Sequence, residues 1–159
     1  MKRMHVNVSV KDLEASIDFY NSLFASVPTV IKTDYAKWML DDPRINFAIT
    51  TRGEQKGIDH LGIQVENDVE LDEVYGRLQN AAAPVIEEGA TTCCYAESEK
   101  SWIFDPQGIA WETFLTRGES PVYGNDLDKN GNTDTACCKP AQAAAKPGSS
   151  CCQDLGREI

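Results

Sequence analysis

The sequence predicts an α+β fold built from two βαβββ modules and followed by a flexible C-terminal tail. The duplication is predicted by a repeat, in which a strand pattern beginning with histidine precedes a helical pattern and three short strand-like runs. The tail is predicted by a change in composition near Arg117, after which large apolar side chains become rare. With 159 residues, the chain is long enough to bury a core without disulfide bonds.

The first module is predicted to span about residues 1–53. Its opening segment, His5–Val10, alternates at period two, which is typical of a half-buried strand. Asp12 is then a plausible N-cap for a helix over 13–24, where apolar side chains recur at helical spacing. Three strand-like runs follow, at 29–32, 35–40 and 45–50. The Asp42-Pro43 dipeptide indicates a turn before the last of them.

The second module is predicted over about residues 57–117 and repeats this order. A strand over 60–65 again begins with a histidine, and apolar residues at helical spacing follow over 71–78. Strand-like runs follow at 85–87, 100–105 and 109–115. Asp105-Pro106 matches the earlier Asp-Pro turn. The second module is longer than the first, and the additional residues are placed in a loop over 87–100.

Residues 118–159 are predicted to form the flexible tail. They are rich in small and polar residues, so they bury too little apolar surface to offset their ordering entropy. The tail carries two adjacent cysteine pairs, Cys137-Cys138 and Cys151-Cys152. Two interpretations stay open for these pairs: accessory thiols that capture a thiophilic ligand, or dispensable residues.

Composition excludes several classes of protein. The formal net charge of −10 argues against a nucleic-acid partner, which requires a basic surface. The sequence has no apolar run of about 18 residues, so no transmembrane helix is predicted. The N-terminal residues enter a strand pattern without the apolar core of a secretory signal, and a cytoplasmic protein is therefore expected.

All six cysteines occur as adjacent pairs, and the third pair, Cys93-Cys94, lies in the predicted loop. A disulfide between neighbouring cysteines is strained, because its short ring departs from the preferred geometry. Reduced thiols in a cytosolic compartment are therefore expected. Because soft thiolates favour soft metals and metalloids, the pairs indicate a thiophilic ligand.

Two histidines and one glutamate are the candidate metal ligands. His5 and His60 are the only histidines in the chain, and they occupy the same position in their modules. Glu112 is the one charged residue in an apolar strand, where a carboxylate is costly to bury unless it is paired or bound to metal. Two histidines and a carboxylate on one face hold Fe(II) and leave positions open for O2 and substrate. The alternative is that Glu112 pairs with Lys100 or Arg117.

Together these features resemble the vicinal oxygen chelate superfamily, the fold of glyoxalases, bleomycin-resistance proteins and extradiol dioxygenases. The resemblance covers about residues 1–117 and is carried by the duplicated modules, by DHLGIQV at 59–65 and by DPQGIAWE at 105–112. Within the superfamily, TTCCYA at 91–96 resembles the C–As bond lyases and the related cadmium-induced proteins. In this chain His5, His60 and Glu112 match the family's metal positions.

The resemblance implies an Fe(II)-dependent enzyme that uses O2 to cleave the carbon–arsenic bond of trivalent organoarsenicals and releases arsenite. Cys93 and Cys94 match its substrate thiol pair, and Lys100 lies in the segment that follows and is a further candidate for binding. Two neighbouring thiols bind one arsenic centre with a gain in effective concentration. Since adjacent side chains of a regular strand point to opposite faces, the pair is expected in a loop or irregular turn that closes over the metal.

Two other functions remain open from the sequence. A non-enzymatic thiol protein that binds cadmium or arsenic needs the cysteines but not the inward His/His/Glu set. A glyoxalase or a fosfomycin-type thiol transferase uses related metal positions, usually with more carboxylates, and needs no Cys93-Cys94 pair. The organic group on arsenic, and whether the chain is a monomer or a homodimer, are not determined by the sequence.

Overall fold

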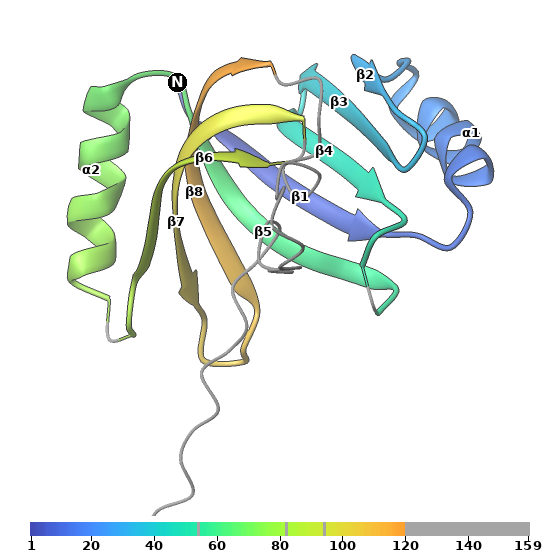
Figure 1. The fold of residues 1–159 in the computed structure, drawn as a ribbon. Helices are drawn as coiled ribbons and strands as arrows, with labels where there is room; N and C mark the ends of the chain where they lie inside the picture. Colours follow the sequence, from blue (N-terminus) through green and yellow to red (C-terminus); the bar gives the residue numbers. More distant parts are fainter. Residues whose placement is uncertain (54, 82, 94, 120–159) are drawn as a thin grey trace, which may run out of the picture.

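The computed structural model describes residues 1–53, 55–81, 83–93 and 95–119. These residues form one eight-stranded sheet with the order β2-β3-β4-β1-β5-β8-β7-β6 and two helices (Figure 1). The predicted α+β fold with two βαβββ modules is confirmed. Within the described ranges, neither helix is long and apolar enough to span a membrane.

The two modules contain the same elements in the same order. The first consists of β1 (Arg3–Ser9), α1 (Leu13–Phe24), β2 (Val30–Ile31), β3 (Tyr35–Asp41) and β4 (Arg44–Thr50). The second consists of β5 (Gly57–Val65), α2 (Asp68–Gln79), β6 (Ile86–Cys93), β7 (Ala96–Phe104) and β8 (Ala110–Glu119). Strand β8 therefore continues two residues beyond the predicted end of the body at Arg117. The predicted tail, with the exception of its first two residues, lies outside the described residues.

Both helices begin at side chains that accept a backbone N–H. Asp12 accepts from the amide of Ala15 at the start of α1, as the sequence predicts. Asn67 accepts in the same way from the amide of Glu70 at the start of α2. Each helix packs on its own module and lies on the outer side of the sheet (Figure 1).

The alternation of side chains along the strands separates an apolar face from a polar face. On β1 and β4, Val6, Val8 and Phe47 belong to the cluster beneath α1, and on β5 and β8, Val65 and Leu115 belong to the cluster beneath α2. The residues between them point to the opposite face, because the period of a strand is two. That opposite face carries the buried polar side chains His5, Asn7, Asn46, His60 and Glu112. The hydrophobic effect at the helices thus positions a polar site at the other face.

The modules are joined by an antiparallel pairing of β1 with β5 at the centre of the sheet. His5 lies opposite Gly62, and Asn7 lies opposite His60. Exchanging the modules turns the first of these pairs into the second, so the two histidines are related by a pseudo-twofold axis. Directly opposed residues on antiparallel strands share a face, and the two imidazoles therefore point to the same side.

Gly62 brings the second module's last strand close to the histidines. β5 and β8 pair in parallel, with Gly62 beside Glu112. A Cβ atom at position 62 would lie 2.5 Å from the backbone oxygen of Glu112, closer than real Cβ contacts. Glycine is therefore required at position 62 for the approach that places Glu112 against the histidine pair.

The predicted loop over 87–100 is wrong for most of its length, because β6 and β7 form a hairpin through it. The two strands pair from Ile86 and Trp102 to Cys93 and Ala96. The sequence does not show the usual alternation of apolar and polar residues here. The inward side chains of β7 face the polar site and are themselves polar, as at Ser98 and Lys100. The Cys93-Cys94 pair falls where β6 ends; residue 94 and the side chain of Cys93 lie outside the described part of the chain.

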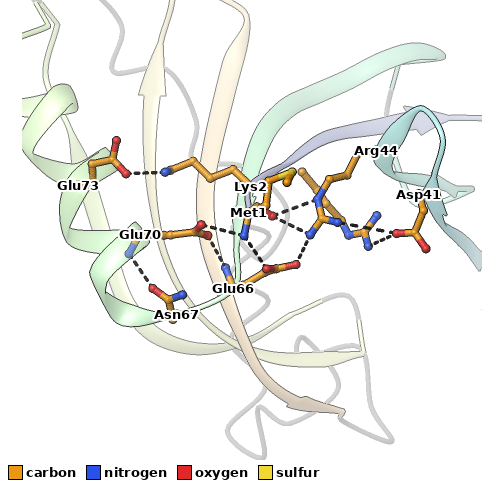
Figure 2. A network of polar contacts seen from close by, with 9 residues as sticks. Met1, Lys2, Asp41, Arg44, Glu66, Asn67, Glu70 and Glu73 are labelled. Atoms are coloured by element: carbon orange, nitrogen blue, oxygen red, sulfur yellow. Dashed lines mark hydrogen bonds and ion pairs between the residues drawn. The ribbon is translucent and has the colours of Figure 1, made fainter.

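A network of ion pairs ties the N-terminus to both modules at the surface (Figure 2). The Met1 ammonium lies 2.6 Å from a carboxylate oxygen of Glu66 and 2.9 Å from one of Glu70. Arg44, the first residue of β4, donates to the backbone oxygen of Met1 and pairs with Glu66. Hydrogen bonds to Glu66 and Glu70 raise the pKa of the amine, so it stays charged at neutral pH.

We expect Gly62→Ala to destabilise the protein by about 1–3 kcal/mol, because the new methyl group forces β5 and β8 apart. Urea unfolding of the metal-free protein measures this change. Gly76→Ala in α2 is the matched control, since nothing lies within 4 Å of a Cβ built there. That variant is expected to stabilise the helix by about 0.5–1 kcal/mol. Equal unfolding midpoints for the two variants would contradict the close approach at Gly62.

Candidate metal centre

His5, His60 and Glu112 converge on one point of the polar face. The two Nε2 atoms lie 3.1 Å apart, and Glu112 Oε2 lies 3.8 Å from that of His5 and 3.6 Å from that of His60. Each of the three side chains exposes at most 6% of its surface to solvent. Their candidate ligand atoms lie within 4.8 Å of one another. Among the described residues, this is the one such group of metal-binding side chains. The sequence prediction that these residues meet agrees with the geometry.

The remaining ring nitrogen of each histidine is occupied by an acceptor. His5 Nδ1 lies 3.0 Å from the backbone oxygen of Asn46, and His60 Nδ1 lies 2.7 Å from Asp59 Oδ2. In a neutral imidazole, an acceptor at Nδ1 holds the proton there and leaves the Nε2 lone pair for a metal. Both imidazoles are therefore oriented as ligands.

Lys100 neutralises the buried carboxylate. Its Nζ donates to Glu112 Oε1 over 2.6 Å, while Oε2 faces the histidines. Burial alone raises the pKa of Glu112, but the Lys100 charge and the two histidines outweigh it and hold the pKa far below its usual range. The alternative pairing with Lys100 is thus present together with the metal-ligand geometry. Arg117 instead pairs with Asp68 and Glu99.

His60 holds its proton unusually tightly in the metal-free protein. Burial lowers the pKa of this imidazole, but the hydrogen bond to Asp59 and the Glu112 carboxylate outweigh burial and raise the pKa to about 9. Protonated His60 also compensates part of the negative charge of Glu112 and Asp59. A divalent cation bound at Nε2 takes over this role, so the donor set fits a metal with mixed nitrogen and oxygen preference.

The first module lacks the counterpart of Glu112. Asn7 pairs with Ala48 in the same way as Gly62 pairs with Glu112, so Ala48 occupies the equivalent position. The first-module side of the site therefore lacks a carboxylate equivalent to Glu112. Asn7 and Asn46 line this part of the site, and their Oδ1 atoms are buried without a hydrogen-bond partner among the described residues.

Aromatic side chains pack around the three ligands. Phe114 meets the His5 ring edge-on at 5.2 Å, and Trp102 meets the His60 ring in the same way at 5.2 Å. The mouth of the site is formed by Tyr35 and Lys37 of β3 on one side and by Ala96 and Ser98 of β7 on the other. The centre is therefore enclosed by apolar rings and opens between the two modules.

The other predicted site residues are placed less completely. Lys100 lies in β7 as a buried partner of Glu112, not in a loop. Cys93 ends β6, and its partner Cys94 lies outside the described residues. The four tail cysteines also fall there: Cys137, Cys138, Cys151 and Cys152.

Sequence reasoning missed three residues that the structure brings to the centre: Asn7, Asn46 and Asp59. Asp59 precedes His60 directly, and neighbours in a regular strand point to opposite faces. Strand alternation therefore predicts no contact between the side chains of Asp59 and His60, and only the structure shows one. The asparagines were detectable only as polar residues at inward positions of two strands.

The fold and the site together define a duplicated βαβββ protein with a buried His/His/Glu centre. The model of the Glyoxalase/Bleomycin resistance protein/Dioxygenase superfamily matches residues 2–113. The chain therefore belongs to this superfamily, as the sequence motifs indicated.

Similar proteins include enzymes with a named substrate class. The chain is 40% identical over 160 residues to the trivalent organoarsenical cleaving enzyme of Bacillus sp. (strain MD1), covering 96% of this chain and 99% of that protein. It is 30% identical over 152 residues to the cadmium-induced protein CadI of Mycobacterium tuberculosis (strain ATCC 25618 / H37Rv), covering 93% of this chain and 100% of that protein. The Mn(II)-bound glyoxalase from Novosphingobium aromaticivorans shares the fold, with a TM-score of 0.54, 18% identity and coverage of 81% and 44% of the two chains.

We expect Asp59→Asn to weaken metal binding about 10- to 100-fold, because the amide orients His60 less firmly and stabilises bound metal less than a carboxylate does. Competition with a chelator, using Fe(II) without oxygen, measures the affinity without reference to any activity. The control is Asp72→Asn on the exposed surface of α2, which is expected to bind as the wild type does. Equal affinities for all three proteins would contradict the role given to Asp59.

Metal binding at neutral pH is expected to release a proton, since the metal ion displaces the proton that His60 holds with a pKa of about 9. The apparent affinity should rise as the pH increases from neutral towards 9, by up to about tenfold per pH unit. Titration calorimetry in buffers of different ionisation enthalpy counts the protons released. Absence of release at pH 7 would show that His60 is neutral before the metal binds.

Proposed function

We propose that this protein cleaves the carbon–arsenic bond of trivalent organoarsenicals such as methylarsonous acid, or related aromatic arsenicals, with Fe(II) as cofactor and O2 as co-substrate. Arsenite and an oxidised organic fragment are the products, and the activity detoxifies the organoarsenical. One observation carries the proposal: the buried His5/His60/Glu112 centre lies in a chain that is 40% identical, over nearly its full length, to a trivalent organoarsenical cleaving enzyme.

The thiol pair is proposed to bind the substrate. Trivalent arsenic is soft, and an arsenical with two hydroxyl groups exchanges both for thiolates, forming two As–S bonds and releasing two water molecules. Cys93 and Cys94 are joined in sequence, so the second bond forms at a high effective concentration. Cys93 ends β6, next to the strand that forms one side of the site's mouth, and this position supports delivery of arsenic to the centre.

The chain's own residues prepare the centre for this chemistry. His5, His60 and Glu112 would hold Fe(II), which when bound supplies the activation of O2 at the positions left open. Lys100 holds Glu112 in place and limits the charge of the buried donor set. Phe114 and Trp102 restrict water around the ligands, which strengthens electrostatic interactions there.

The buried amides of Asn7 and Asn46 face the side of the centre on which Ala48 replaces a carboxylate. An unpaired buried acceptor is costly unless a ligand donates a hydrogen bond to it. We assign these amide oxygens to accept hydrogen bonds from water held near the metal. They would orient the substrate relative to the open metal positions.

Sequestration of cadmium or arsenic by the thiols is the second candidate, and the 30% identity to a cadmium-induced protein favours it. Sequestration by the thiols does not use the buried His/His/Glu centre. A glyoxalase-type or fosfomycin-type reaction uses related metal positions and makes no use of the Cys93-Cys94 pair. The buried His/His/Glu centre supports an enzyme over sequestration, and the thiol pair supports the arsenical reaction over the other two enzymatic reactions.

The test is reconstitution with Fe(II) without oxygen, followed by O2 and methylarsonous acid, with arsenite as the measured product. Wild-type protein is expected to release arsenite, and Cys93→Ser to release it at least about 100-fold more slowly at low substrate, because the second thiol no longer binds. Absence of arsenite from wild-type protein, together with tight stoichiometric Cd(II) binding, would overturn the proposal in favour of sequestration.

Cys137→Ser is the matched control, since it removes one thiol of another adjacent pair. It is expected to retain the wild-type rate at saturating substrate. Removal of residues 118–159 then tests the tail thiols: a lower rate at low substrate alone indicates capture, whereas equal rates at both concentrations show that the tail is dispensable.

A further inference from the structure

Tyr95 links the β6–β7 hairpin of the second module to the first module. Its hydroxyl donates to Asp34 Oδ1 over 2.8 Å, across 61 residues of sequence. Its ring lies 5.9 Å from that of Tyr35, and Lys32 Nζ lies 5.2 Å from its centroid. The three partners all come from the segment around the β2–β3 turn.

The backbone of Tyr95 is held in an uncommon conformation. Its φ of 62° lies in the left-handed region, which a bulky side chain rarely adopts. Such a conformation persists where surrounding contacts over-determine it, and it points to a functional constraint. The turn at Tyr95 directs the aromatic ring away from its own hairpin and onto the opposite module.

Asp34, which accepts the hydrogen bond from Tyr95, is held in place by the first module. Asp34 is also paired through its second oxygen with Arg52, which follows β4. The carboxylate is thus oriented by the first module alone. Burial raises the pKa of Tyr95, and Asp34 raises it further, so the hydroxyl keeps its proton at neutral pH and remains a donor.

The contact lies at the mouth of the metal centre. Tyr35 and Lys37 form its first-module side, and Ala96 and Ser98 form the other. Tyr95 comes directly before Ala96 and one residue after the Cys93-Cys94 pair. Tyr95 therefore connects the two sides of the mouth, and it directly follows the thiol pair in the sequence.

From this geometry we infer that Tyr95 is a positioning residue for the thiol pair: its hydrogen bond to Asp34 and its packing on Tyr35 fix the hairpin tip across the mouth. The inference rests on the proposed function, because the thiols are there assigned to bind arsenic. Tyr95 is not among the residues that line the metal centre. It determines how often the arsenic-bound hairpin occupies the position from which the arsenical reaches the centre.

The first test is amide hydrogen exchange of full-length Tyr95→Phe, which removes the hydroxyl and retains the ring. Exchange across residues 86–104 is expected to rise roughly tenfold, the effect of losing one hydrogen bond to a carboxylate at a partly exposed site. Asp34→Asn should raise it less, because the amide oxygen still accepts. Combined in one chain, the two substitutions should act less than additively, since they remove the same interaction.

The second test separates positioning from thiol binding. In Tyr95→Phe, kcat for arsenite release is expected to fall about tenfold, while the stoichiometry of phenylarsine oxide bound by the metal-free protein stays at the wild-type value. Tyr20→Phe on α1 is the matched control, because this tyrosine packs within the first module, and the substitution should leave exchange of the hairpin and kcat unchanged.

Unchanged hairpin exchange in Tyr95→Phe would overturn the inference, as would raised exchange with unchanged kcat. Loss of phenylarsine oxide binding in this variant would also overturn it, since the residue would then belong to the binding site itself. If wild-type protein releases no arsenite, the proposed function fails. The exchange measurement still decides whether the contact of Tyr95 with Asp34 fixes the hairpin. The failure of the inference and the failure of the proposed function are therefore distinguishable.

Discussion

The antiparallel ladder between β1 and β5 is the constraint on which the rest of the structure depends. Its register sets His5 and His60 about one pseudo-twofold axis and turns both rings to one face. A shift of one strand by one residue would turn its histidine towards the apolar cluster beneath a helix and separate the two rings, because the side-chain period of a strand is two. The cores under α1 and α2 therefore keep the two histidines in place, although they lie on the other face.

Ion pairs and hydrogen bonds stabilise the buried charged groups that the β1–β5 ladder brings together. A carboxylate, two imidazoles and an ammonium group are all buried within one cluster, and each is costly to bury alone. They are tolerated because each has a partner, from Lys100 on Glu112 to Asp59 on His60. The duplication is consequently not symmetric in chemistry: His60 is supported by a carboxylate and His5 by a backbone carbonyl, and Glu112 has only Ala48 as its counterpart. This asymmetry leaves the first-module side of the centre without a carboxylate.

The site also combines rigid and less constrained parts. The three ligands lie on paired strands in the middle of the sheet, whereas the hairpin that carries the thiols lies at its edge, beyond β8. A strand at the edge has a neighbour on one side only, so contacts made by its tip determine its position. Tyr95 supplies such a contact to the opposite module. The arrangement suits a reaction in which one element binds a thiophilic substrate and another performs the chemistry.

The sequence by itself determined the duplicated βαβββ fold, the helix capped by Asp12 and the candidate metal ligands His5, His60 and Glu112, because these depend on local periodicity and on repeated positions. It failed over 87–100, where inward polar side chains concealed the alternation of β6 and β7. Tertiary structure alone decided the pairing of Lys100 with Glu112, the support of His60 by Asp59 and the contact of Tyr95 with Asp34. The physical reason is that these contacts depend on strand register and on the approach of the two modules, and local sequence patterns do not encode either distance.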